Sequence, residues 1–79
     1  MISNLVIEGG ENMFPNLQAE QARKKMTNQQ VANYLGISRR TYEQKKQSGR
    51  FLAIECNHLC TLFQCEFTYL FAVDTPKTA

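Results

Sequence analysis

Apolar residues recur at helical spacing through most of the chain, separated by short polar or glycine-containing breaks. Val31, Ala32 and Leu35 share one face of a helix in an otherwise polar stretch. Further along, one face of a second segment carries Cys56, Leu59, Cys60 and Phe63. Nothing between residues 17 and 72 requires a strand. The pattern therefore predicts an all-α fold.

Capping residues set the starts of the first two expected helices. Asn16 is a helix-capping residue type and predicts a first helix from Leu17 to about Lys25. Thr27, with Gln30 three residues later, forms a capping box for a second helix. Each helix therefore begins after a polar side chain that can accept a backbone hydrogen bond.

Glycines separate the second helix from the third and end the third. Gly36 can adopt the left-handed backbone that a tight turn between helices requires, and Ile37 would fill the inside of that turn. Ser38 then caps a third helix, which is expected to end near Ser48, before Gly49. Two short helices joined by a glycine turn are typical of a helix-turn-helix.

The remaining segments complete a five-helix domain. A fourth helix is expected from about Ala53 to Phe63, and a short fifth helix contains Phe67, Leu70 and Phe71. The organisation we expect is a flexible arm over residues 1–15, a helix-turn-helix domain over residues 16–72 and a frayed tail over residues 73–79.

The first twelve residues allow two interpretations. Met1–Ile7 is an apolar run that could pair as a strand, and the polar break after it suits a flexible arm. Alternatively, the codons for Glu8–Met13 can spell a purine-rich ribosome-binding sequence ahead of a genuine start at Met13. Residues 1–12 would then be a translated leader. The sequence leaves both open.

Charge is distributed unevenly along the chain. The net charge is only +2, yet eight of the nine Lys and Arg residues lie between positions 23 and 50, with Glu43 as the one acid among them. A basic centre in an otherwise acidic chain is typical of a protein that binds the phosphate backbone of nucleic acid. A merely solvated helix face usually mixes both signs. Double-stranded DNA is therefore the expected partner.

The third expected helix can present side chains to the major groove of DNA. Its apolar residue Tyr42 should face the core, so the opposite face should point outward. Arginine can bind guanine through two hydrogen bonds, glutamine can bind adenine in the same way, and threonine can contact the thymine methyl group. The expected base-reading residues are Ser38, Arg39, Arg40, Thr41, Glu43 and Gln44.

A second group of residues suits the phosphate backbone, which positions a protein on DNA without specifying sequence. Asn28 and Gln29, at the start of the second helix, can offer side chains and unpaired backbone N–H groups. The expected non-specific phosphate ligands are Lys24, Lys25, Lys46 and Arg50.

A metal site is not expected. On a helix, His58 would lie about 200° around from Cys56 and Cys60. Neither a C-x-x-C spacing nor a fourth ligand is present. The cysteines, the third of which is Cys65, are expected to act as small buried apolar residues of a cytoplasmic protein.

Enzymatic and membrane functions are not expected either. The single histidine has no nucleophile-and-acid arrangement around it in sequence, and no phosphate-cradling loop occurs, so neither catalysis nor a cofactor is predicted. Glu43 and Glu55 are expected to be surface charges rather than a catalytic pair. No apolar stretch approaches the length of a membrane span, and no signal peptide is recognisable.

Two stretches carry a family resemblance, NLQAEQARKKMTNQQVANYLGISRRTYEQKKQSGRF and HLCTLFQCEFTYLF. Together they cover about residues 16–72 and resemble the Cro/C1-type (Xre-like) helix-turn-helix transcription regulators of bacteria and their phages. The resemblance implies a compact five-helix, lambda-repressor-like domain that binds operator DNA as a homodimer and represses transcription. It places base reading on Ser38, Arg39, Arg40, Glu43 and Gln44, and phosphate contacts near Thr27, Asn28 and Arg50.

The chain departs from that family at three positions. The family often pairs an arginine in the first helix with a glutamate late in the third, and Gln21 and Lys46 stand there instead. The rigidity of the core is therefore expected to rest on packing alone. Lys45 stands at a position that is more often apolar, and would extend its amine outward.

Assembly and an alternative function follow from the same resemblance. The family's dimer contacts involve the loop before the fourth helix and the end of the fifth, where the apolar candidates are Leu52, Ile54, Phe67 and Leu70, some of which are expected to belong to the core instead. No separate effector domain follows, so no small-molecule effector is expected. The same fold could instead serve as a protein-interaction module, an antitoxin or anti-repressor, through apolar residues at 2–7 or in the last two helices.

Overall fold

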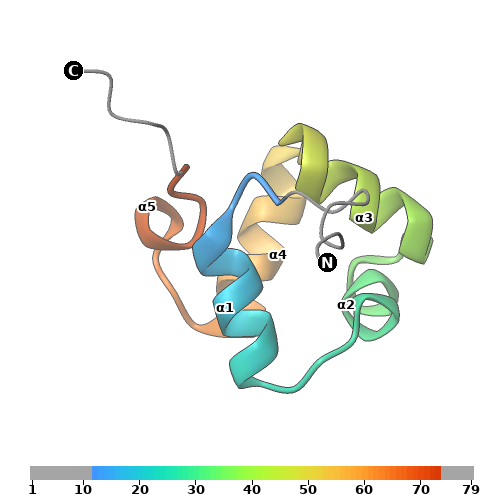
Figure 1. Ribbon diagram of the computed structural model, residues 1–79, viewed down its shortest axis with the longest axis horizontal. Coiled ribbons are helices and arrows are strands. Elements are labelled where there is room, and N and C mark those ends of the chain that lie inside the picture. The colour runs from blue at the N-terminus through green and yellow to red at the C-terminus, as the bar shows by residue number, and fades with distance from the viewer. Residues whose placement is uncertain (1–11, 74–79) are drawn as a thin grey trace, which may run out of the picture.

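Five α-helices make up the part of the chain that the computed structural model describes, residues 12–73, and no strand occurs within it. They are α1 (Pro15–Arg23), α2 (Asn28–Leu35), α3 (Arg39–Ser48), α4 (Ala53–Phe63) and α5 (Phe67–Leu70), as Figure 1 shows. The predicted all-α architecture with five helices is confirmed for these residues. The expected strand-like run, the rest of the leader up to residue 11 and the tail from residue 74 lie outside the described residues.

The start of α1 differs from the prediction. Its N-cap is Phe14, and Pro15 occupies the first helical position, where the missing N–H of proline is no loss. Asn16 lies inside the helix, and its Nδ2 donates to the Tyr69 carbonyl oxygen at 2.8 Å. The prediction that Asn16 caps this helix is therefore wrong. Its side chain instead ties α1 to α5.

The segment before α1 is attached to the end of α3. The Met13 backbone N–H donates to the Lys46 carbonyl oxygen at 2.9 Å. Asn12 Nδ2 donates to Gln18 Oε1 at 3.2 Å. The first bond holds this segment against α3, which the sequence proposes as the DNA-reading helix, and the second holds it against α1.

The predicted caps of α2 and α3 are confirmed. Thr27 Oγ1 accepts the Gln30 N–H at 3.1 Å, and the Thr27 N–H donates to Gln30 Oε1 at 2.9 Å, which completes the capping box. Gly36 has a φ of 76°, in the left-handed region expected of it. Ser38 Oγ accepts the Thr41 N–H at 3.0 Å at the start of α3. Local sequence signals therefore define the α2–turn–α3 unit.

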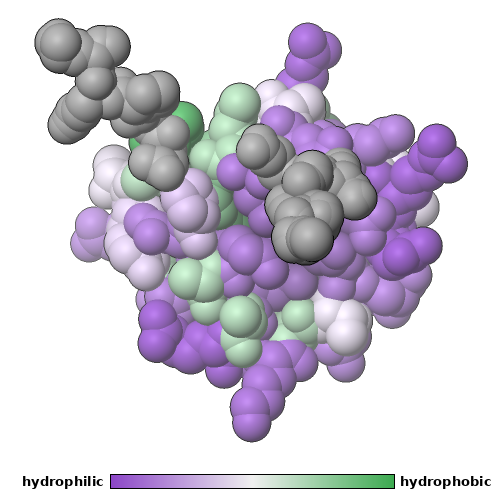
Figure 2. All heavy atoms as spheres, viewed as in Figure 1, coloured by the Kyte–Doolittle hydropathy of each residue, from purple (hydrophilic) through white to green (hydrophobic). Residues whose placement is uncertain are grey.

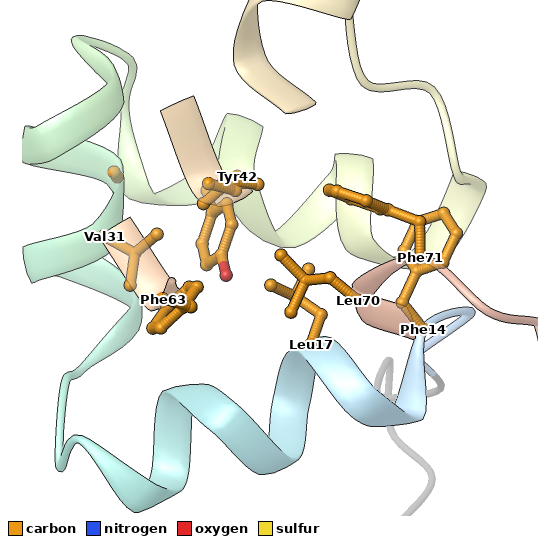
Figure 3. Packing of buried hydrophobic residues seen from close by; sticks show 9 residues of the cluster. Phe14, Leu17, Val31, Tyr42, Phe63, Leu70 and Phe71 are labelled. Atoms are coloured by element: carbon orange, nitrogen blue, oxygen red, sulfur yellow. The ribbon is translucent and has the colours of Figure 1, made fainter. Parts of the chain in front are cut away.

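The core lies where the helices meet, and Figure 3 shows its side chains converging between them. Tyr42 of α3 lies among them, fully buried, with its hydroxyl directed toward α1. The other core residues are Phe14, Leu17, Val31, Ala32, Leu59, Phe63, Leu70 and Phe71. Because Tyr42 is anchored on this cluster, the inner side of α3 is determined and its outer side follows.

Candidate nucleic-acid interface

α3 has one side in the core and one side in solvent. Its buried residues are Tyr42 and Lys46, which lie one turn apart. Arg40 and Gln44 are both exposed, and each lies about 160° around the helix from Tyr42. Figure 1 shows α3 along the outer edge of the bundle, and the side of the molecule that carries α2 and α3 is mostly hydrophilic in Figure 2.

Of the six predicted base-reading residues, Ser38 and Thr41 take part in capping α3, whereas, within the described part of the chain, the side chains of Arg40 and Gln44 are free to meet a partner. The hydroxyls of Ser38 and Thr41 are hydrogen bonded to each other at 2.9 Å, in addition to the capping bond. The side chains of Arg40 and Gln44 form no hydrogen bond or ion pair with another described residue. The long, polar side chains that can reach a partner from the middle of this face are therefore Arg40 and Gln44.

The other two predicted base-reading residues belong to a line of contacts that continues into α2. Glu43 Oε2 lies 3.5 Å from Arg39 Nη1 and accepts a hydrogen bond from Asn28 Nδ2 at 3.0 Å. Arg39 is well exposed, whereas Glu43 is half-buried between the two helices. The carboxylate of Glu43 therefore has partners within the protein on both sides.

Lys46 departs furthest from its predicted place. The sequence puts it on the surface as a phosphate ligand, but only 4% of it is exposed. Its ammonium donates to Gln18 Oε1 at 2.7 Å, Asn28 Oδ1 at 2.9 Å and Gln21 Oε1 at 3.3 Å. The predicted surface position is wrong, because all three donors of this ammonium are directed at oxygens of α1 and α2.

Gln21 completes this polar group inside the bundle. Its Nε2 donates to the Met26 carbonyl and to Asn28 Oδ1, both at 3.0 Å, and its Oε1 accepts from the Tyr42 hydroxyl at 2.8 Å as well as from Lys46. We call Gln18, Gln21, Asn28, Tyr42 and Lys46 the Lys46 cluster. The sequence suggested that the rigidity of the core rests on packing alone. Instead, the hydrogen bonds of the Lys46 cluster also join α1, α2 and α3.

Burial shifts the protonation of two members of the cluster. It lowers the pKa of Lys46 to about 8, an effect that the negative charge of Glu43 partly opposes. Lys46 therefore keeps its proton at neutral pH, with Nζ 4.9 Å from the centre of the Tyr42 ring. Burial raises the pKa of Tyr42, so its hydroxyl remains a donor to Gln21.

The predicted phosphate ligands other than Lys46 differ in how far they are engaged. Lys24, Lys25 and Arg50 are exposed. The hydroxyl of Thr27 is used by the capping box, and Gln29 Nε2 donates to Asn33 Oδ1 at 2.9 Å. The Asn28 amide makes three hydrogen bonds inside the protein, so its side chain is not directed at a phosphate as expected. Its backbone N–H still lies at the first position of α2.

Two charged residues turn inward where α3 meets α4. Lys45 Nζ lies 3.1 Å from Glu55 Oε1 and donates to the Arg50 carbonyl at 3.3 Å. Glu55 is 6% exposed, and its carboxylate also accepts the Leu52 N–H at 2.9 Å. Lys45 therefore does not extend its amine into solvent, and Glu55 is not a surface charge, contrary to both predictions. The pair fixes the start of α4 against α3.

Three of the four predicted dimer residues are exposed. Leu52, Ile54 and Phe67 expose between 56% and 59% of their surface. Leu70 is fully buried in the core, so its predicted place at an interface is wrong. Phe67 stacks near the core aromatic Phe71, with ring centres 5.1 Å apart, and so lies at the edge of the core.

The cysteines and the histidine lie on α4 and the turn after it. Cys56, Cys60 and Cys65 are free and half-buried. Burial raises the pKa of the Cys56 and Cys60 thiols, which disfavours reactive thiolates. Within residues 12–73 no group of three or more His, Cys, Asp or Glu side chains is placed to hold a metal ion. No helix in this range is long and apolar enough to cross a membrane.

The Lys46 cluster was missed at the level of sequence, although a signal for it exists. Gln21 follows the core residue Leu17 by four positions, and Lys46 follows the core residue Tyr42 by four. Each polar residue therefore shares the inward face of its helix with a buried apolar one. Two polar side chains at inward positions of neighbouring helices are expected to find partners there, because buried polar groups are almost always hydrogen bonded.

Comparisons with protein-family models, with curated proteins and with solved structures found no match. Function is therefore inferred from the geometry of α3 and its surroundings.

Proposed function

We propose that this chain is a sequence-specific DNA-binding transcription regulator with a lambda-repressor-like helix-turn-helix, acting as a repressor of phage or mobile-element type. α3 would lie in the major groove, and the start of α2 would face the phosphates. The observation that carries the proposal is the outer side of α3. There, Arg40 and Gln44 are exposed and lie opposite the anchored Tyr42, and their side chains have no partner among the described residues.

Charge supports the same surface. Lys24, Lys25, Arg40 and Arg50 are exposed and form no ion pair with another described residue. Unpaired cations near a groove-reading helix would attract the DNA backbone and release its counterions. Lys46 adds little to that attraction despite its charge, because its ammonium is enclosed in the Lys46 cluster.

A homodimer is part of the proposal. The exposed side chains of Leu52, Ile54 and Phe67 are the apolar groups that a second copy could cover. A dimer would place two copies of α3 on half-sites about one helical turn of DNA apart. The selected DNA should then have two-fold symmetry.

Selection of bound duplexes from a random DNA pool tests the proposal. Wild type should enrich one sequence, and Arg40→Ala and Gln44→Ala should each lose discrimination at the base pair that the side chain reads. A loss of about 1–3 kcal/mol per contact is expected. Asn57→Ala, another exposed polar position, on α4, is the control and should keep the wild-type preference. Because the side chains of Arg40 and Gln44 are exposed, both variants should remain folded, which circular dichroism checks.

If both α3 variants enrich the same DNA sequence as wild type, the outer side of α3 does not read bases. If wild type enriches no duplex at low ionic strength, the DNA-binding proposal fails as a whole.

A second function, from a different class, is favoured by the exposed apolar side chains. Leu52, Ile54 and Phe67 could bind another protein, as in an antitoxin or anti-repressor. Pull-down in the presence of nuclease separates the two functions. A partner captured through DNA disappears on nuclease treatment, whereas a directly bound protein remains and is lost in Leu52→Asp.

A further inference from the structure

The ammonium of Lys46 determines which way the Asn28 amide faces. An ammonium can only donate hydrogen bonds, and Lys46 Nζ lies 2.9 Å from Asn28 Oδ1. Gln21 Nε2 donates to the same oxygen at 3.0 Å. With two donors on one side, the amide oxygen must face the Lys46 cluster and the NH₂ group must face away.

The NH₂ group of Asn28 in turn faces Glu43. Asn28 Nδ2 donates to Glu43 Oε2 at 3.0 Å, and hydrogen bonds to a carboxylate are stronger than those between neutral groups. The same oxygen lies 3.5 Å from Arg39 Nη1. The Glu43 carboxylate is therefore held between a donor on α2 and a guanidinium at the start of α3.

We propose that Lys46 and Asn28 are positioning residues that act through Glu43 to orient Arg39 for reading one base pair of DNA. The inference rests on the proposed function. Of the two adjacent arginines, Arg39 is then the pre-oriented one, and Arg40 adjusts on binding. Pre-orientation reduces the side-chain entropy lost when an arginine forms two hydrogen bonds with guanine.

Asn28→Asp interrupts this line of contacts at one atom. The carboxylate keeps the same shape and an oxygen toward Lys46, but it presents an oxygen instead of an NH₂ group to Glu43. An acid is also favourable in the first turn of a helix, so α2 should be retained. Adding Glu43→Gln restores a donor and acceptor pair with reversed direction, from Gln Nε2 to Asp. That double variant has the net charge of wild type.

The DNA arm of the experiment starts from the base pair at which Arg39→Ala relaxes discrimination. At that base pair, Asn28→Asp should lose discrimination by about tenfold. Adding Glu43→Gln should not recover it, because the NH₂ group that then faces the new carboxylate at position 28 stands where Glu43 Oε2 contacts Arg39, and a guanidinium cannot accept a hydrogen bond. Lys46→Met should produce a smaller loss, because Gln21 still donates to Asn28. The control Asn33→Asp places the same added charge on α2 and should keep wild-type discrimination while binding all sequences more weakly.

A second arm needs no DNA. The χ1 scalar couplings of residue 43, measured by NMR at pH 7 in the free protein, should indicate one rotamer in wild type and in the double variant. Rotamer averaging is expected in Asn28→Asp and, to a smaller extent, in Lys46→Met, where Gln21 still donates to Asn28.

Each result decides a separate point. If wild type selects no duplex, the proposed function fails. The rotamer measurement then still tests whether Asn28 and Lys46 hold the Glu43 side chain in one conformation. If wild type selects a duplex but Arg39→Ala relaxes no position, or Asn28→Asp keeps full discrimination, the inference is overturned and the proposed function stands. Recovery of discrimination by the double variant would also overturn it, because Arg39 would then be oriented without a carboxylate at position 43. Unchanged behaviour of Lys46→Met in both arms removes Lys46 as a positioning residue.

Discussion

A lysine can be buried when its ammonium meets an acceptor in each donor direction. Lys46 meets this condition with three side-chain amide oxygens and the face of the Tyr42 ring. Amide oxygens carry only partial charge, however, so the cation is less well compensated than it would be beside a carboxylate. The lowered pKa of Lys46 expresses that deficit.

The pH dependence of stability should show the titration of Lys46. Its pKa is about 8 in the folded protein against 10.5 ordinarily, so between these values the unfolded chain binds more protons. Stability contributed by Lys46 is therefore gained as pH rises through 8 and lost as pH falls back. Relative to Lys46→Met, the free energy of unfolding of wild type should increase by up to about 3 kcal/mol between pH 7.5 and 10.5. Urea titrations at several pH values measure it. A constant difference would mean that Lys46 is not desolvated.

The roles of single residues that could be predicted from the sequence are those that depend on residues close to them in the chain. Thr27 with Gln30, and Ser38 with Thr41, act within one turn, and their bonds were expected from spacing. Lys46 was misplaced because its partners come from α1 and α2, far away in sequence. A charge near the end of a basic helix is indistinguishable in sequence from its exposed neighbours unless the inward face is traced residue by residue.

At the scale of elements, two left-handed glycines bracket α3. Gly36 precedes the helix, and a Cβ built there would meet no atom within 4 Å. Gly49 follows it, and a Cβ there would come within 2.5 Å of Met13 Sδ. Both have positive φ, 76° and 80°, so both tolerate a side chain poorly.

Alanine at these two glycines should separate backbone strain from steric contact. Gly36→Ala is expected to lower the free energy of unfolding by about 1 kcal/mol, from the left-handed backbone alone. Gly49→Ala should lower it further, because Met13 must also move. Shortening Met13 to alanine in the Gly49→Ala background should return part of the difference, measured by urea denaturation. Equal destabilisation by the two substitutions would mean that Met13 does not pack on Gly49.

Helix boundaries were predictable to the degree that they carry local signals. The range of α4 agrees with the expected one, and α2 and α3 begin immediately after their predicted caps. α1 was misjudged at both ends. Proline starts it before Asn16, and it ends before Lys25, which adopts a φ of 56° without being a glycine. A left-handed lysine has no sequence signature, since only the surrounding fold imposes it.

At the scale of the whole molecule, the net charge does not show which cations are already paired with an acid. Of the basic residues in the central segment, Arg23 pairs with Glu20 at 3.2 Å, and Lys45 pairs with Glu55 at 3.1 Å. Lys24, next to Arg23, is exposed and has no such pair among the described residues. The charge pattern of the sequence thus located the cations, and the structure separates those that are paired with an acid from those that are not.

Salt titration of DNA binding should distinguish these two kinds of cation. Lys24→Gln should weaken binding equally across DNA sequences and reduce the slope of log affinity against log salt by about one. Arg23→Gln, the neighbouring control, should change the slope less, because Glu20 already compensates its charge. Fluorescence anisotropy from low to moderate ionic strength gives both slopes. Equal slopes for Lys24→Gln and wild type would exclude Lys24 from the phosphate contacts.

The bond from the Met13 N–H to the Lys46 carbonyl limits how far the chain can be trimmed. A fragment that starts at Phe14 would leave that carbonyl unpaired and would also remove Asn12, whose amide shares the Gln18 acceptor with the Lys46 ammonium. The first loss falls on the backbone of Lys46, in the proposed reading helix, and the second falls on Gln18 of α1, which accepts the Lys46 ammonium. Shortened versions made for spectroscopy or crystal growth should therefore begin no later than Asn12.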